Sequence, residues 1–370
     1  MFRRKMIQCI TILVTTMLVF GACASQSASS SSAGPDLNSM SLQEIEKKAK
    51  EEGRIDSVGM PDDWANWGDT WIDIYELYGL EHTDIDMSSA EELALFEAEK
   101  SNATKDIGDV GQSFGPVAKE MGLSRPYKTS YWDDIPAFAK DDEGHWIIAY
   151  LGTMSIITNT ALVPNPPKSF DDILKGDYTV SIGDVAKATQ AQNSVLSAAL
   201  AYGGDETNIM PGLDYFRKIA EQGRLDMGDP SIPRLEKGEV AVAFLWDYNA
   251  LGYRDVILGN NPNLNFEVYI PQEASISSGY TTIINAYSKR PYAAALTREY
   301  IMSDPGQINL AKGYARPIRS SVVLPPDVAS KMIDNSQYTN AQTIKDPVAW
   351  QETVAGLGDL WQNEVIAYLK

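Results

Sequence analysis

Two long, largely apolar stretches of β-forming residues, 146–159 and 277–287, constrain the fold of this chain more than any other feature. The first has Gly152 near its middle and is followed by a Pro-rich corner. Strand and helix patterns alternate on both sides of these stretches, which favours mostly parallel sheets covered by helices on both faces. About 330 ordered residues exceed one comfortable core, so two domains are expected. The two stretches are then the places where the chain crosses between the domains.

The first 22 residues have the composition of an export signal. Three basic residues at 3–5 precede an apolar run over 6–20, and small residues close the segment. The run is shorter than the ~20 residues that a membrane-spanning helix needs, and no basic stop follows it. We therefore expect residues 1–22 to be removed as a signal peptide.

The sequence Gly-Ala-Cys at 21–23 resembles the cleavage box of bacterial lipoproteins, in which the Cys becomes the lipidated N-terminal residue. Phe20 departs from the aliphatic residue usual in that box, and a plain secretory signal with a chance Cys23 is the alternative. A Ser-rich segment follows, which indicates that residues 23–40 form a flexible tether. The resemblance implies an exported protein, lipid-anchored to the outer face of the cytoplasmic membrane or on a periplasmic side.

Few residues remain that form disulfides or hold metals. Removal of the signal peptide takes Cys9, and Cys23 is then the single cysteine. His82 and His145 are the only imidazoles, which argues against a His-rich zinc centre. The formal charge of −19 disfavours nucleic acid as a partner. We expect no metal and no cofactor.

The segment GMPDDWANWGDTW, residues 59–71, holds three of the eight tryptophans. Its spacing predicts a helix that is capped by Asp62 or its neighbour and places Trp64 in the first turn. Trp67 follows one turn later, and the spacing points Trp71 into the interior. The front of the segment, at the end of a strand, is the place where a ligand would meet it.

Six motifs follow one another between residues 55 and 319. They are IDSVGMPDDW, DIGDVGQSFGPVAKE, GHWIIAYLGTMSIITNT, KSFDDILKGDYTVSIGD, LEKGEVAVAFLWDYNA and a long final segment that begins SSGYTTIINAYSKRP. Their order resembles that of the extracellular solute-binding proteins of ABC importers, in the group with iron(III)-, polyamine- and thiamine-binding members. The resemblance implies a two-lobed, type II periplasmic-binding-protein-like α/β fold whose crossing strands act as a hinge. It assigns residues 41–152 plus 280–370 to lobe 1, which is discontinuous, and residues 153–279 to lobe 2.

The resemblance also implies capture of a solute without chemistry. The lobes close on a small molecule, and the closed protein delivers it to the permease subunits of an ABC transporter. We expect a monomer and no enzyme. The alternative class is a secreted, anchored glycosidase, because such enzymes also use tryptophans and paired carboxylates.

In this fold ligands lie beyond the carboxyl ends of strands, on loops and helix N-termini. The family often places a ligand-contacting aromatic or acidic residue at the position of 246–248. The candidate ligand-binding residues are Asp62, Trp64, Trp67, Asp109, Gln112, Ser113, Ser155, Asp184, Thr189, Trp246, Asp247, Tyr248 and Tyr280.

Two classes of ligand compete. A small organic cation, such as a polyamine or a thiamine-like amine, would gain ~0.5–2 kcal/mol from each aromatic wall. Its walls would be Trp64, Trp67 and Trp246, and its charge partners Asp62, Asp109 and Asp247. An anion, such as a sugar phosphate, phosphonate or carboxylate, would use helix N-termini and polar side chains. Those side chains would be Gln112, Ser113, Thr189 and Arg316.

Iron(III) is a third alternative. Iron-binding relatives generally use paired tyrosines, and this chain has no adjacent Tyr-Tyr pair, although Tyr248 and Tyr280 could converge. The aromatic and acidic character of the loops favours the organic cation.

Overall fold

The computed structural model describes residues 34–370, which form one compact unit. The expected signal peptide and Cys23 lie outside the described residues. The end of the predicted tether is packed instead of free, because Leu37 is 1% exposed within a short 3-10 helix, Leu37–Ser39. Arg125 also donates a hydrogen bond to the carbonyl of Pro35 (3.3 Å). The folded body therefore begins before Leu37.

One mixed sheet runs through the molecule in the order β2-β1-β3-β10-β5-β8-β6-β7. The strands are β1 (Arg54–Val58), β2 (Glu81–Thr83), β3 (Ile107–Gly111), β5 (Trp146–Asn159), β6 (Val180–Ser181), β7 (Leu225–Asp226), β8 (Val242–Trp246) and β10 (Ser275–Asn285). Strand β1 is parallel to β2 and β3, and β6 is parallel to β7 and β8. Between these parallel groups, β10 is antiparallel to β3 and β5, and β5 is antiparallel to β8. Short strands complete the sheet edges: β4 (Ser124–Arg125), β9 (Phe266–Tyr269), β11 (Arg316–Pro317) and β12 (Ala341–Thr343).

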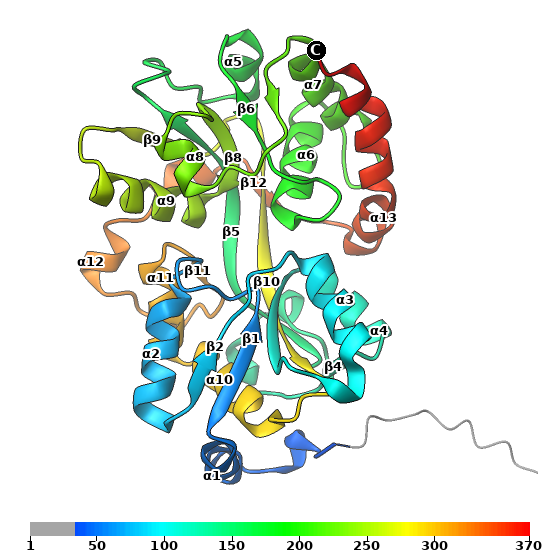
Figure 1. Cartoon of the computed structure of the whole chain (residues 1–370), viewed down its shortest axis with the longest axis vertical. Helices are drawn as coiled ribbons and strands as arrows, with labels where there is room; N and C mark the ends of the chain where they lie inside the picture. Colours follow the sequence, from blue (N-terminus) through cyan, green and yellow to red (C-terminus); the bar gives the residue numbers. More distant parts are fainter. Residues whose placement is uncertain (1–33) are drawn as a thin grey trace, which may run out of the picture. The chain divides into compact units, whose positions relative to one another are not determined.

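Strands β5 and β10 pass through both halves of the sheet (Figure 1). β5 pairs with β10 over its first half and with β8 over residues 154–158. The predicted crossings at 146–159 and 277–287 are therefore confirmed. We call β1–β3 with their helices lobe 1, and β6–β8 with their helices lobe 2.

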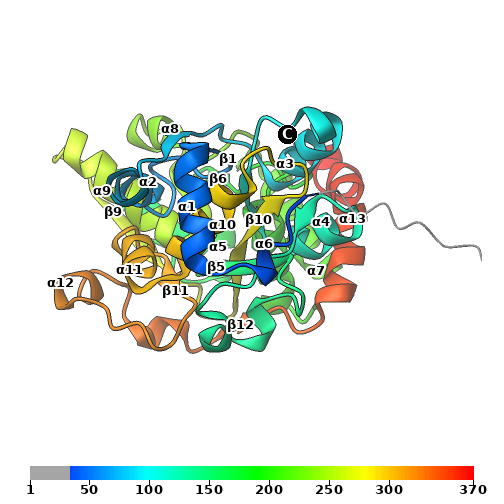
Figure 2. The ribbon, with the colours of Figure 1, turned by 90° about the horizontal axis from the view of Figure 1, so that it is seen from below.

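Helices cover both parallel groups of strands. Those of lobe 1 are α1 (Leu42–Glu52), α2 (Trp67–Tyr78), α3 (Ser89–Glu99), α4 (Phe114–Glu120), α10 (Pro291–Met302) and α11 (Asp304–Lys312). Those of lobe 2 are α5 (Phe170–Lys175), α6 (Thr189–Ala201), α7 (Met210–Glu221), α8 (Ile232–Glu236) and α9 (Asp247–Asn260). In both views α2 and α3 lie on opposite sides of β1 (Figures 1 and 2).

The C-terminal helix α13 (Pro347–Glu364) packs against α7 of lobe 2 (Figure 1). The rings of Phe216 and Trp361 lie 5.6 Å apart, and Arg217 forms a 3.1 Å ion pair with Glu364. The predicted boundaries place residues 280–370 in lobe 1, whereas α13 packs against lobe 2. The other boundaries stay a prediction. The short helix α12 (Pro326–Ala329) lies in the segment that precedes β12.

The tryptophan segment begins with a turn, and α2 starts only at Trp67. Ala65 and Asn66 have φ angles of 49° and 59°, in the left-handed region that an α-helix cannot contain. The helix predicted from Asp62 is therefore shorter at its start, and Trp64 lies in the turn. Trp71 is 5% exposed, as expected for a residue that points into the lobe.

Candidate ligand-binding site

A cavity of about 490 Å³ lies between loops of lobe 1 and loops of lobe 2, a size typical of small-molecule sites. Lobe 1 lines it with Gly59, Trp64, residues 86–89, Glu91, Glu92, Asp109 and Tyr280. Lobe 2 lines it with Gly183, Asp184, residues 187–190, residues 229–231, Leu245 and Tyr253. The lobe 1 loops follow β1 and precede α3, and Asp109 lies within β3. The lobe 2 loops follow β6 and β7 and precede α6 and α8, as expected for a parallel α/β sheet.

The charge of the lining is strongly negative. Its acidic residues are Asp86, Glu91, Glu92, Asp109, Asp184 and Asp229. Lys187 is the single basic residue of the lining, and its ammonium lies 3.5 Å from Glu91 and 3.9 Å from Asp184. Four of the six acidic residues, Asp86, Glu91, Asp184 and Asp229, are exposed, and they give the cavity a field that favours positive charge.

Two of the acidic residues, Glu92 and Asp109, form the buried floor of the cavity. Each is 1% exposed, and Glu92 Oε2 has no hydrogen-bond partner among the described residues, whereas the indole N–H of Trp67 lies beside Asp109 and acts to lower its pKa. Burial raises the pKa of Asp109 to about 8. Burial, together with the neighbouring charge of Asp109, also raises the pKa of Glu92. A buried carboxylate without a partner is unfavourable, so a ligand's positive charge would be stabilised here.

Two glycines make room for the floor carboxyl of Glu92. A Cβ atom on Gly59 would lie 2.3 Å from Glu92 Oε1, and one on Gly108 would lie 2.7 Å from Oε2. Glu92 was not predicted, because an acidic residue in the first turn of α3 is fully explained by the helix dipole. The sequence signal of space beside it is a pair of glycines, Gly59 directly after β1 and Gly108 on the neighbouring strand β3.

Trp64 and Tyr280 form an aromatic wall beside this floor, with their ring centroids 5.4 Å apart. The indole of Trp64 donates to the hydroxyl of Tyr150 (2.8 Å), which in turn donates to Asp109 Oδ2 (2.6 Å). This chain of hydrogen bonds fixes the wall relative to the floor. Tyr150 is fully buried in β5 and was not predicted, because an apolar crossing strand gives no sign of such a contact.

The turn that presents Trp64 rests on the end of α11. A Cβ atom on Gly313 would lie 2.4 Å from the backbone carbon of Ala65, and Asn66 Nδ2 donates to the carbonyl of Asn309 (2.9 Å). Gly313 has a φ of −84°, so steric contact alone requires glycine there.

Replacement of Gly313 by alanine is expected to destabilise the protein by about 1–3 kcal/mol, because the added methyl group must displace the Ala65–Asn66 turn. Urea unfolding measures the loss. Gly356→Ala is the matched control, because its methyl group meets nothing within 4 Å and lies inside α13. Equal stability of the two variants would contradict the packing described here.

Five of the predicted residues line the cavity: Trp64, Asp109, Asp184, Thr189 and Tyr280. That they contact the ligand stays a prediction. The other eight lie outside the lining: Asp62, Trp67, Gln112, Ser113, Ser155, Trp246, Asp247 and Tyr248. Asp62 is exposed on the turn before α2, whereas Trp67 is fully buried and stacks on Trp71.

Most of these eight side chains have structural contacts instead. Gln112 Oε1 accepts from Ser278 (3.3 Å), and Ser155 donates to the carbonyl of Leu245 (2.9 Å). Trp246 is fully buried, and its indole donates to the hydroxyl of Tyr280 (3.3 Å). We therefore leave these residues out of the proposed site.

Asp247 and Tyr248 are also buried, each 1% exposed. Both oxygens of Asp247 are occupied, by the backbone N–H of Thr153 (2.9 Å) and by the hydroxyl of Tyr338 (2.7 Å). Arg316, a candidate for an anion, stacks on the ring of Tyr338 at 3.6 Å. These contacts are internal to the described residues and occupy both oxygens of the Asp247 carboxylate.

Residues 111–115 read Gly-Gln-Ser-Phe-Gly, which matches the Gly-x-Ser-x-Gly pattern of serine hydrolases, with Ser113 between β3 and α4. A triad requires a histidine beside that serine. His82 Nε2 contacts Ser57 (2.8 Å) and His145 Nδ1 contacts Ser124 (3.0 Å), while Ser113 Oγ has no partner among the described residues. The motif therefore does not form a catalytic triad.

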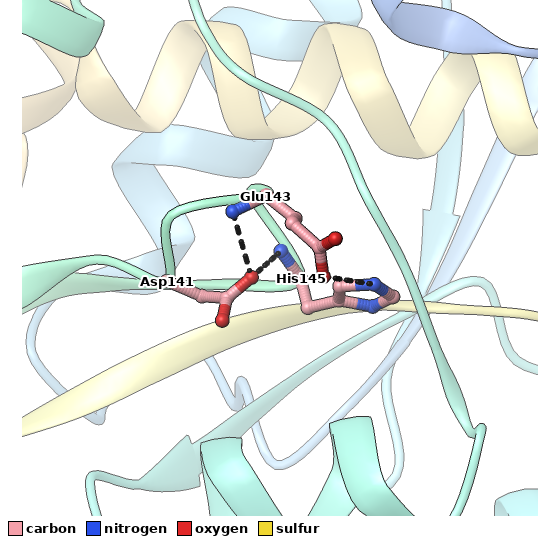
Figure 3. A group of neighbouring side chains, drawn as sticks. All are labelled: Asp141, Glu143 and His145. Atoms are coloured by element: carbon pink, nitrogen blue, oxygen red, sulfur yellow. Dashed lines mark hydrogen bonds and ion pairs between the residues drawn. The ribbon is translucent and has the colours of Figure 1, made fainter.

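Asp141, Glu143 and His145 bring three side chains with metal-binding atoms together, away from the cavity (Figure 3). The ammonium of Lys119 already lies 2.7 Å from Asp141 and 2.8 Å from Glu143. The cluster is thus an ion-pair network at the start of β5. Over residues 34–370, no other set of three His, Cys, Asp or Glu side chains has its ligand atoms within 4.8 Å of one another.

Comparison with known families identifies the architecture. Residues 102–341 match the family described as bacterial extracellular solute-binding protein. The chain belongs to this family. A comparison with curated proteins finds no significant match.

Solved structures of similar fold include the periplasmic binding protein AfuA from Actinobacillus pleuropneumoniae with fructose-6-phosphate bound, at 17% identity and a TM-score of 0.69, covering 85% of this chain and 99% of that one. The ferric binding protein from Campylobacter jejuni has 19% identity and a TM-score of 0.63, covering 84% and 99%. A putative spermidine/putrescine ABC transporter protein from Listeria monocytogenes has 14% identity and a TM-score of 0.61, also covering 84% and 99%.

The predicted type II periplasmic-binding-protein fold is confirmed by these structures. As a member of the family, the solute-binding protein takes a small-molecule ligand and serves the permease of an ABC importer. None of the helices within residues 34–370 is long and apolar enough to cross a membrane. The alternative of a glycosidase finds no support in the family or in the similar structures.

Proposed function

We propose that the solute-binding protein captures a small organic cation, such as a polyamine or a thiamine-like amine, for import. The observation that carries this proposal is the acidic, aromatic lining of the cavity, with the carboxyl groups of Glu92 and Asp109 buried at its floor. An ammonium group would supply hydrogen-bond donors and a balancing positive charge. Trp64 and Tyr280 add aromatic faces that attract cations.

An anionic ligand is the rival, and one observation favours it. Helix α6 begins at the cavity without a side-chain cap, and the buried hydroxyl of Thr189 has no partner among the described residues. A helix N-terminus attracts anions. The excess of carboxylates in the same lining supports the cation over this rival.

Thermal-shift and calorimetric titrations with spermidine, thiamine, fructose 6-phosphate and iron(III) citrate test the proposal. At a concentration 100-fold above the Kd, a bound ligand stabilises the protein by ~2.7 kcal/mol. We expect stabilisation by at least one of the two amines and none by the phosphate or the iron complex.

Substitution of the lining residue Lys187 tests whether the ligand is a cation or an anion. Lys187→Ala is expected to leave the affinity for a cation unchanged or higher, because it removes a like charge from the cavity. The same change would weaken an anion. Lys331→Ala, an exposed lysine outside the lining, is the control. Binding of fructose 6-phosphate that Lys187→Ala abolishes would overturn the cation proposal.

We also propose that the exported protein is held at the membrane by a lipid on Cys23 and acts as a monomer. The Gly-Ala-Cys box and the Ser-rich segment behind it support the anchor.

A further inference from the structure

Two loops of lobe 2 separate the ligand cavity from a second cavity. They are the β6–α6 loop, residues 182–188, and the β7–α8 loop, residues 227–231. The second cavity, of about 370 Å³, lies between these loops and the C-terminal helix α13. Because Asp184 and Asp229 line both cavities, the two loops form the partition between them.

Helix α13 forms the far side of the second cavity, with Gly358, Trp361 and Gln362. The helix is held firmly on lobe 2, because Trp361 is 5% exposed and Thr353 donates a hydrogen bond to the carbonyl of Glu206 (2.6 Å). It lies outside residues 102–341, the part of the chain that matches the family. Its contacts, and not the family, therefore indicate its role.

The backbone of α13 rests directly on the β6–α6 loop. A Cβ atom on Gly358 would lie 3.1 Å from the Cβ atom of Ala186, in the middle of that loop. The loop is a tight turn around Asp184, whose carboxylate accepts from the N–H of Ala186 (2.9 Å) and whose carbonyl accepts from the N–H of Ala188 (2.9 Å). These hydrogen bonds make the turn move as a unit, so a displacement at Ala186 is carried on to Lys187.

We infer that α13 positions the ligand-binding face of lobe 2 from behind. Its backbone at Gly358 supports Ala186, and the β6–α6 loop thereby holds Asp184 and Lys187 at the ligand cavity. The distance of 3.5 Å between Lys187 and Glu91 of lobe 1 depends on this position. The second cavity gives the loop space in which to shift. The inference holds for a cationic and for an anionic ligand.

Hydrogen exchange of backbone amides tests the inference without a ligand. Gly358→Val places a stiff, branched side chain against Ala186, so the loop must give way. We expect the amides of residues 184–190 to exchange about tenfold faster. Gly356→Val is the matched control, because a Cβ atom at that exposed position of the same helix meets nothing within 4 Å. Unchanged exchange of the loop, or an equal loss of protection throughout lobe 2, would overturn the inference.

A second substitution separates this contact from general damage to α13. Ala186→Gly removes the methyl group that lies nearest to position 358. The double variant Gly358→Val/Ala186→Gly is therefore expected to exchange within about twofold of Ala186→Gly alone. General damage to the helix would not be repaired by a change on the loop. If Gly358→Val accelerates exchange as much in the Ala186→Gly background as in the wild type, the contact does not position the loop.

Calorimetry with spermidine and thiamine measures the consequence for binding. For an amine that binds the wild-type protein, Gly358→Val is expected to lower the affinity about fivefold, and Gly356→Val to leave it unchanged. Equal affinities of the two variants, despite faster exchange in the first, would overturn the link between α13 and the ligand cavity. This measurement rests on the proposed function. If neither amine binds, that proposal fails, whereas hydrogen exchange still decides whether α13 positions the loop.

Discussion

Affinity for the organic cation is expected to rise by as much as about 50-fold between pH 6 and pH 8. The reason is the carboxyl group of Asp109, whose pKa burial raises from 3.8 to about 8 in the ligand-free protein. Below pH 8 this group is protonated, and a cation must displace the proton to gain a charge partner. Each pH unit below the pKa then weakens binding by up to tenfold. Aliphatic amines stay charged throughout this range, so the ligand adds no pH dependence of its own.

The pH dependence of folding stability has the opposite sign to the pH dependence of affinity. Because the folded pKa of Asp109 lies above the ordinary value, the native state holds a proton that the unfolded chain releases. The ligand-free protein is therefore most stable, as far as this group is concerned, below about pH 4, and it loses that stability as the pH rises through 8. Glu92, with its pKa also raised by burial, acts in the same direction.

Calorimetry in buffers of different ionisation enthalpy measures the proton release directly. We expect about one proton released for each cation bound near pH 6.5. Asp109→Asn removes the ionisable group while keeping an acceptor for Tyr150, so it is expected to flatten the pH dependence. A wild-type affinity that stays constant from pH 6 to pH 8, with no proton released, would contradict this account of the floor.

The crossing strands were predictable because their signal is local. Long apolar β stretches at 146–159 and 277–287 have no room within a single small lobe, and the structure forms β5 and β10 there. The start of α2 was not predictable in the same way. It depends on the left-handed turn at Ala65 and Asn66, which Gly313 permits from almost 250 residues away.

The residues of the candidate site also divide into those that sequence position predicts and those that depend on distant contacts. Trp64 lies in the turn that follows β1 and Asp109 lies within β3, and the structure brings both to the cavity on the side where a parallel sheet presents its loops. The same rule predicted Asp247 and Tyr248 at the end of β8, but both are buried. A Cβ atom on Gly152 would lie 2.4 Å from the ring of Tyr248, so the glycine leaves space for that ring. Tyr338, far along the chain, covers Asp247. Sequence position alone cannot reveal either contact.

Asp247→Ala is expected to lower the free energy of unfolding by about 3 kcal/mol and to leave the preference of the protein for a cationic ligand unchanged. Its carboxylate accepts hydrogen bonds from the backbone N–H groups of Thr153 and Tyr248, both at 2.9 Å, and from the hydroxyl of Tyr338 at 2.7 Å. Alanine would leave these buried donors unpaired, and each unpaired group costs about 1–3 kcal/mol. The contact with Thr153 joins α9 to the crossing strand β5, so its loss loosens lobe 2 at the hinge.

Urea unfolding of the Asp247→Ala and Asp247→Asn variants separates packing from binding. Asparagine keeps the oxygen that Thr153 and Tyr248 need, and its amide can donate to the Tyr338 hydroxyl, so most of the stability is expected to return. A ligand-binding role would give the reverse pattern, since asparagine removes the charge that a cation requires. A change of up to 0.5 kcal/mol in stability is ordinary for a surface substitution. If both variants stay within 0.5 kcal/mol of wild-type stability and both lose ligand binding, then Asp247 belongs to the binding site.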